Sequence, residues 1–323
     1  MKKLITLVLA CVALTSCSKE NEEDVDPNAP VEIKLNAGIG NIEAIGRAAV
    51  SSLPTEGLDV FFAKATDAPT ASWGSAKALY AKLDESGKVS FYAEAVRTNK
   101  APQYYNPNTT LKSHLIGYYV GDATSSLAGG KVSLTIDGSN DIMATNALSG
   151  DKNAQFEQFT FEHLLSQLIF EVKCADGISA DKVKETFGTV TKIEVLNQPI
   201  NIELTLGDTP SVTTATTTGS ANFTTSTDNN VEITNTATQI GDAIMVYTNQ
   251  DLGKKDSPIQ LKVYTSTYDS GLDVKAFINS GNDGLESGKK HTITLSFSLT
   301  EVSPTAAISA WANATNNGTG EIK

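Results

Sequence analysis

Apolar and polar residues alternate along much of this chain, and the alternation predicts short β-strands. In the segment 31–40, Val31, Ile33 and Leu35 begin a series of apolar side chains at every second position. A period of two places such side chains on one face of a strand. Similar patterns, separated by turns rich in glycine, aspartate and asparagine, occupy residues 58–62, 89–96, 115–120, 132–136, 156–161, 168–174, 193–196, 200–206, 244–248, 259–265, 272–278 and 292–299. The sequence therefore predicts an all-β fold.

One short helix interrupts the strand pattern. Ser179 is placed to cap a helix over 180–187, and Gly188 is placed to end it. Val183 and Phe187 lie four residues apart in this segment and share a face of the helix. We therefore expect a single helical turn or two, packed on the β-structure through these two side chains.

The number of strands predicts two domains. About fourteen strands would form two β-sandwiches of roughly seven strands each. A new series of strands begins near residue 158. We therefore expect one sandwich over 31–157 and a second over 158–323.

The N-terminus has the features of a secreted lipoprotein. Two lysines precede an apolar run over 4–14, which is too short to cross a membrane as a helix but suits a signal peptide. The run leads into Leu14-Thr15-Ser16-Cys17, which resembles a bacterial lipobox, where the cysteine is acylated and the bond before it is cut. We expect a signal peptide over 1–16, a lipid such as palmitate on Cys17 and a flexible acidic tether over 17–30. An ordinary signal peptide with an incidental cysteine is the alternative.

Composition and charge narrow the class of protein. Aspartate and glutamate total 37 against 25 lysines and arginines, which gives a formal net charge of −12. A surface this acidic repels a phosphate backbone, so we expect no nucleic acid partner. Charged residues make up only 19% of the chain, and the polar, weakly charged remainder favours an extracytoplasmic β-protein. The threonine-rich stretch 209–239 is predicted to form an exposed hairpin, with disorder as the alternative.

Candidate catalytic and metal-ligating residues are few and scattered. His114, His163 and His291 lack the paired spacing of a zinc site, and His163 is expected to have a structural place at the start of a strand. Cys174 follows the parity of a strand's apolar residues and is predicted to be a buried side chain rather than a nucleophile. The acid-rich turn 137–141 could hold calcium, although turn chemistry explains it equally well. We expect no catalytic residue, no cofactor and no metal, and therefore no enzyme.

Several segments in a fixed order resemble the fimbrillin family, the subunits of the protease-assembled (type V) pili of Bacteroidota. The lipobox Cys17 and the acidic tether come first, and the strand 31–39 and Arg47 follow. The further matching segments are Tyr104-Tyr105-Asn106-Pro107, Leu115-Ile116-Gly117-Tyr118-Tyr119, Asp141-Ile142-Met143-Ala144, Phe161-Glu162-His163-Leu164-Leu165-Ser166-Gln167-Leu168, Ile308-Ser309-Ala310-Trp311 and Gly318-Thr319-Gly320. Each segment is degenerate by itself, and their order over essentially the whole chain carries the resemblance.

The resemblance implies a surface-exposed lipoprotein of the outer membrane with two transthyretin-like β-sandwiches in tandem. An arginine-specific protease would cut in the loop 44–49, between Arg47 and Ala48, and release the first strand. The open edge would then accept a strand from the next subunit, and subunits would assemble head to tail into an adhesive fimbria. Within the donor segment 305–323, the candidate residues are Ala306, Ile308, Ala310 and Trp311. The implied partners are other fimbrial subunits, the protease and, before cleavage, the outer membrane.

Three other functions stay open at this point. A pilus anchor or tip adhesin of the same fold would keep its first strand or lack a free donor segment. A surface lipoprotein that binds glycans or nutrients beside an outer-membrane transporter would not polymerise. A hydrolase is the least favoured, because no acid–base pair or nucleophile arrangement is visible in the sequence.

Overall fold

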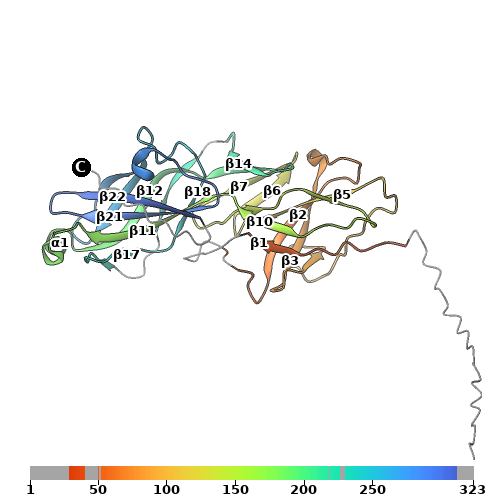
Figure 1. Cartoon of the computed structure of the whole chain (residues 1–323), viewed down its shortest axis with the longest axis horizontal. Helices are drawn as coiled ribbons and strands as arrows, with labels where there is room; N and C mark the ends of the chain where they lie inside the picture. Colours follow the sequence, from red (N-terminus) through yellow and green to blue (C-terminus); the bar gives the residue numbers. More distant parts are fainter. Residues whose placement is uncertain (1–28, 41–49, 51, 218, 226–229, 311–323) are drawn as a thin grey trace, which may run out of the picture.

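The computed structural model describes residues 29–40, 50, 52–217, 219–225 and 230–310. In these residues the regular secondary structure is nearly all β-strand, as the sequence predicts. The elements that are not strands are the helix α1 (Ala180–Phe187) and two 3-10 turns, η1 (Trp73–Ser75) and η2 (Asn279–Gly281). Figure 1 shows an elongated molecule with α1 at one end and the strands β2, β3 and β5 toward the other.

An eight-stranded sheet forms the end of the molecule away from α1. Its order is β1-β10-β8-β5-β2-β3-β4, and β9 pairs with β5. Its members are β1 (Ala37–Ile39), β2 (Leu58–Lys64), β3 (Lys77–Leu83), β4 (Val89–Tyr92), β5 (Ser113–Tyr119), β8 (Met143–Ala144), β9 (Leu148–Gly150) and β10 (Phe159–His163). The β1–β10 pair is parallel and the other pairs of this sheet are antiparallel.

A four-stranded sheet joins two distant parts of the sequence. It contains β6 (Thr124–Ala128), β7 (Lys131–Thr135), β13 (Asn201–Thr205) and β14 (Ser211–Thr214), in the order β14-β13-β7-β6. At the central pair, Val132 lies opposite Leu204 and Leu134 lies opposite Ile202, and all four side chains are buried. Because this sheet combines strands from both sides of residue 158, the division of the chain there stays a prediction.

Two five-stranded sheets share a core in the second half of the chain, as in a β-sandwich. One has the order β17-β11-β21-β22, with β18 paired to β11, and the other has the order β15-β12-β19-β20, with β16 paired to β12. Their members are β11 (Ser166–Cys174), β12 (Thr189–Pro199), β15 (Ser220–Thr224), β16 (Val231–Glu232), β17 (Thr238–Gln239), β18 (Ile244–Val246), β19 (Ile259–Thr265), β20 (Leu272–Ala276), β21 (Lys289–Phe297) and β22 (Val302–Ala310). Phe170 and Val172 of β11 belong to the same buried cluster as Ile193 and Val195 of β12, which is the contact expected between facing sheets.

The apolar side chains form two clusters. The larger one runs from the two five-stranded sheets into the four-stranded sheet and reaches Ile116 and Tyr118 of β5. The smaller one lies within the eight-stranded sheet and includes Phe62, Phe91 and Phe159. The smaller cluster also contains the apolar residues of the segment 31–39, so this segment is part of the core at that end of the molecule.

Two local predictions need correction. The helix has the predicted bounds and buries Val183 and Phe187, but Ser179 makes no side-chain capping hydrogen bond. The described strands of the threonine-rich stretch 209–239 do not pair with each other as a hairpin, because β14 joins β13 and β15 joins β12 in different sheets. The strand β14 instead forms a hairpin with the preceding strand β13 across residues 206–210, and β15 pairs with β12.

Candidate functional site

The segment 31–39 pairs with β10 on one of its sides. Ala37 lies opposite Phe159 and Ile39 lies opposite Phe161 in the parallel β1–β10 ladder, and the Phe159 amide donates to the Asn36 carbonyl at 2.9 Å. The regular strand is therefore shorter than the predicted 31–40. Before Ala37 the segment makes only single β-bridges to residues outside the named strands, from Glu32 to Tyr104 and from Asn36 to Lys88.

The opposite side of the same segment pairs with the start of β4 and with the loop that follows β4. The Val89 amide donates to the Leu35 carbonyl at 3.0 Å, and the Ile33 amide donates to the Gln103 carbonyl at 2.7 Å. The Tyr105 amide completes this side by donating to the Val31 carbonyl at 3.0 Å. With partners on both sides, the segment fills a gap in the sheet, and its removal would leave unpaired backbone groups on both sides of that gap.

The side chains of the segment alternate as the sequence predicts. Ile33, Leu35 and Ala37 are 3%, 3% and 2% exposed, whereas Lys34 and Asn36 are exposed to solvent. The buried side chains pack in the cluster of aromatic residues, where rings meet edge to face, for example Phe62 with Phe91 and Phe62 with Phe159. Burying one aliphatic side chain of this size contributes roughly 1.5–3 kcal/mol. The segment is therefore held by its side chains as well as by its backbone.

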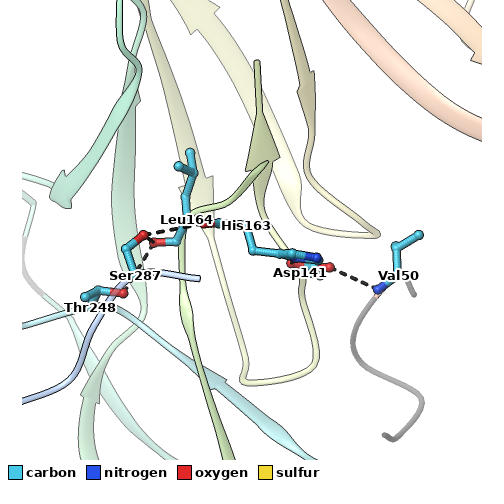
Figure 2. Close-up of polar contacts among 6 residues, drawn as sticks. All are labelled: Val50, Asp141, His163, Leu164, Thr248 and Ser287. Carbon is cyan, nitrogen blue, oxygen red and sulfur yellow. Dashed lines mark hydrogen bonds and ion pairs between the residues drawn. The ribbon is translucent and has the colours of Figure 1, made fainter. Parts of the chain in front are cut away.

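A buried carboxylate, that of Asp141, binds the backbone at Val50. The Val50 amide donates to Asp141 Oδ2 at 3.0 Å, and His163 Nδ1 lies 2.9 Å from Asp141 Oδ1 (Figure 2). The Asp141 and His163 side chains are 1% and 3% exposed. Burial and the nearby negative charge of Asp141 raise the pKa of Tyr119 to about 12.

The next residue after His163 connects this cluster to the second half of the chain. Ser287 Oγ donates to the Leu164 carbonyl at 2.9 Å and Thr248 Oγ1 donates to it at 3.3 Å (Figure 2). Ser166 Oγ donates to the Glu286 carbonyl at 2.8 Å. The sequence prediction placed His163 at the start of a strand, but it is the last residue of β10, where the chain turns toward β11. Its structural role there is to bind Asp141.

The candidate donor segment begins in the edge strand β22. This strand is antiparallel to β21 from Val302 opposite Phe297 to Ala310 opposite Lys289. Ala306 and Ile308 are half-buried and pack against the larger core. Pro304 is buried in the same strand, and a proline is tolerated in an edge strand because its missing N–H can lie on the unpaired side.

The described cysteine and histidine side chains that could act as nucleophiles or metal ligands are buried and contact neighbouring protein groups. Cys174 is 1% exposed, its Sγ lies 3.5 Å from the Ile233 carbonyl oxygen, and burial raises the pKa of its thiol. His114 contacts Ser149 Oγ at 2.6 Å and the Ala68 carbonyl oxygen at 2.8 Å. In the described part of the chain, no group of three or more histidine, cysteine, aspartate or glutamate side chains could hold a metal ion.

The turn 137–141 is explained by its own hydrogen bonds. Asp137 Oδ1 accepts hydrogen bonds from the Ser139 amide at 2.9 Å and from the Ser139 hydroxyl at 2.6 Å. Asn140 Oδ1 accepts from the Asp137 amide at 3.0 Å. The last acid of the turn, Asp141, is the one that binds His163. Turn chemistry therefore accounts for these residues, as one of the two sequence interpretations had it.

The predicted lipidation site Cys17, the predicted cleavage residues Arg47 and Ala48 and the donor candidate Trp311 lie outside the described residues. The structure brings Asp141, His163 and Val50 together, and sequence reasoning did not connect them. His163 and Asp141 each lie in a segment that resembles the fimbrillin family, which is the signal that could have paired them, whereas nothing marks Val50. Among the described residues, no helix is long and apolar enough to cross a membrane.

The fold can now be compared with known proteins. The model of the fimbrillin-like family matches residues 53–311, which is well over half of the chain. The chain belongs to the fimbrillin-like family. The match includes Asp141, His163 and all of β22, and it begins just after Val50, so the cluster of Figure 2 lies at the edge of the family's shared region.

Solved structures support the fold of this fimbrillin-like chain. A candidate cell adhesion protein of Bacteroides uniformis aligns with a TM-score of 0.58 and 14% identity, covering 87% of this chain and 98% of that one. A candidate cell adhesion protein of Bacteroides ovatus aligns with a TM-score of 0.56 and 14% identity, covering 88% of this chain and 99% of that one. At such identities the likeness concerns the fold alone. A search of curated proteins finds no match to the sequence.

Proposed function

We propose that this chain is a structural subunit of a cell-surface fimbria. It is exported as a lipoprotein with its lipid on Cys17, cut between Arg47 and Ala48 by an arginine-specific surface protease, and polymerised by donor-strand exchange. Membership of the fimbrillin-like family and structural neighbours described as cell adhesion proteins support a location at the cell surface and a role in adhesion. The proposed role needs no cofactor and no catalytic residue.

The observation that carries the proposal is the position of the segment 31–39. It occupies a gap between β10 and the backbone at 87–105, buries Ile33, Leu35 and Ala37, and is followed in the sequence by Arg47. A cut after Arg47 would separate this segment covalently from the rest of the sheet. An apolar gap lined by unpaired N–H and C=O groups accepts another strand with alternating apolar side chains.

The donor in this proposal is the segment 305–323 of the next subunit. Ala306, Ile308 and Ala310 have the alternate spacing of Ile33, Leu35 and Ala37. Because donor and acceptor are different surfaces of the subunit, the contact is heterologous and propagates as a fibre. Other fimbrial subunits, identical or different, are therefore the proposed partners in the assembly.

The experiment that tests the proposal is N-terminal sequencing and intact mass of the protein recovered from the cell surface. The expected N-terminus is Ala48, in material of high assembled mass. The variant Arg47→Lys should retain the segment 31–39 and stay out of the assemblies, and Cys17→Ala should lose the lipid. A wild-type chain that keeps an acylated Cys17 and the segment 31–39 would contradict the subunit role.

One observation favours a second candidate, a pilus anchor or tip protein of the same fold. Residues Val302–Ala310 already form β22 in their own chain, with Ala306 and Ile308 packed on its core. A donor strand must leave β21 or act through residues beyond Ala310, and a tip protein needs neither. The same N-terminal sequencing separates an anchor, which keeps its first strand, from a processed subunit.

A further inference from the structure

The guanidinium group of Arg97 is largely buried and binds backbone carbonyls of neighbouring strands. The chain contains two arginines, Arg47 and Arg97, so an arginine-specific protease has two possible targets. The Arg97 side chain is 10% exposed. Its Nε donates to the Ala81 carbonyl at 2.9 Å and its Nη2 donates to the Val60 carbonyl at 3.1 Å. Val60 and Ala81 are partners in the β2–β3 pair, so the guanidinium is fixed across two neighbouring strands.

Further contacts surround the same guanidinium. Its Nη1 lies 3.2 Å from Asp59 Oδ2 and donates to the Ala95 carbonyl at 2.8 Å. Its carbon atom Cζ lies 5.4 Å from the centre of the Phe61 ring and 5.7 Å from that of Tyr80, within the range of cation–π attraction. A protease pocket that binds arginine would have to replace all of these contacts at once.

The backbone of Arg97 is also unsuited to a protease cleft. Its φ of 53° is in the left-handed region, which residues other than glycine adopt only where their surroundings fix them. The turn is closed by the Arg97 amide, which donates to the Glu94 carbonyl at 3.0 Å, and by the Glu94 carboxylate, which accepts from the Thr98 hydroxyl at 2.6 Å and the Asn99 amide at 2.9 Å. Cleavage needs the target in an opened, extended conformation, so this turn would have to unfold locally.

We propose that the burial of the Arg97 guanidinium restricts arginine-specific cleavage of the folded chain to Arg47. The inference rests on the proposed function, which supplies the processing at Arg47. Arg97 is thus a specificity-determining residue for processing, because its turn lies between β4 and β5 of the sheet that must stay intact to receive a new strand. A cut after Arg97 would break the chain between β4 and β5, so that the strands of this sheet would belong to two separate fragments.

The test uses two variants that lack Arg47. In Arg47→Lys, Arg97 is the only arginine. In Arg47→Lys/Val96→Arg, a second arginine stands one residue earlier in the same turn, at a position whose side chain is 76% exposed. Both are treated in the folded state with an arginine-specific protease, and the products are identified by intact mass and N-terminal sequence. The same protease in urea, after unfolding, shows that Arg97 is a competent target in the open chain.

We expect the folded Arg47→Lys chain to stay intact and the double variant to be cut after position 96, at a rate at least ~100-fold higher. Cleavage of folded Arg47→Lys after Arg97 at a similar rate would overturn the inference. Resistance of both variants would also overturn it, because the backbone turn rather than the guanidinium would then protect the site. If the wild-type chain recovered from cells is not cut at Arg47, the proposed function fails while the result for Arg97 stands.

Discussion

Two buried histidines of this chain show different ways in which a protein accommodates a side chain that can carry charge. His163 has a carboxylate partner, because Asp141 lies 2.9 Å from its Nδ1 atom. His291 lies in β21 with no exposed surface, and its Nε2 accepts a hydrogen bond from the Glu286 amide at 3.3 Å. Burial lowers the pKa of His291 to about 4. The folded protein therefore favours the neutral form of His291.

The lowered pKa of His291 predicts that acid destabilises the protein through this residue. The pKa is about 4 in the folded state against 6.5 for an unperturbed histidine, so the unfolded chain binds more protons between these values. Stability is full above pH 6.5 and decreases as the pH falls toward 4, by about 2 kcal/mol between pH 8 and pH 5. Urea unfolding at the two pH values should show this loss in the wild type and not in His291→Gln. An equal loss in both proteins would contradict the prediction.

At the scale of single elements, the sequence predicted the bounds of a helix or strand correctly where both its apolar spacing and its ending residues were visible. The helix α1 and the strand β19 have the bounds that the sequence predicts, because apolar spacing and a terminating glycine or turn define them locally. The strand β6 was not predicted, since Thr124–Ala128 offers only one large apolar side chain. The strand β3 was not predicted either, because apolar Leu79 and Tyr80 are adjacent and obscure the alternation.

Two neighbouring residues of the segment 31–39 allow the contribution of its buried side chains to stability to be measured against an exposed control. Leu35→Ala removes a side chain that is 3% exposed in an aromatic cluster, and we expect it to lower the free energy of unfolding by about 2–5 kcal/mol. Lys34→Ala changes the neighbouring exposed residue and should stay within about 0.5 kcal/mol. Urea unfolding of the uncut chain measures both. If the two variants lose the same small amount, the segment is not part of the core.

At the scale of the whole molecule, the sequence predicted the fold class but not the contacts between distant strands. The register of Val132 against Leu204, the bond from Val50 to Asp141 and the enclosure of Arg97 by Val60 and Ala81 join residues far apart in the chain. Each of these contacts depends on which strand edges meet, and alternation along one segment contains no information about its partner. Resemblance to a family supplied the proposed processing site, whereas the contacts that enclose Arg97 required the structure.

We predict that the segment 31–39 stays bound to the rest of the molecule after the chain is cut. Its hydrogen bonds to Phe159, Val89 and Gln103 and the burial of Ile33 and Leu35 do not depend on the bond after Arg47. Assembly then requires that the donor strand of another subunit displace this segment. An excess of a free peptide with the sequence of the segment should therefore compete with the donor for the gap in the sheet.

A synthetic peptide of residues 29–40 tests this competition. Chain cut after Arg47 in vitro should form high-mass assemblies slowly, and the peptide should suppress them in proportion to its concentration, as followed by light scattering. A peptide with Ile33→Asp and Leu35→Asp is the matched control, because it keeps the backbone pairing groups but cannot bury two of the alternate side chains. Assembly that ignores the first peptide, or that both peptides suppress equally, would show that the gap left by the segment 31–39 is not where subunits join.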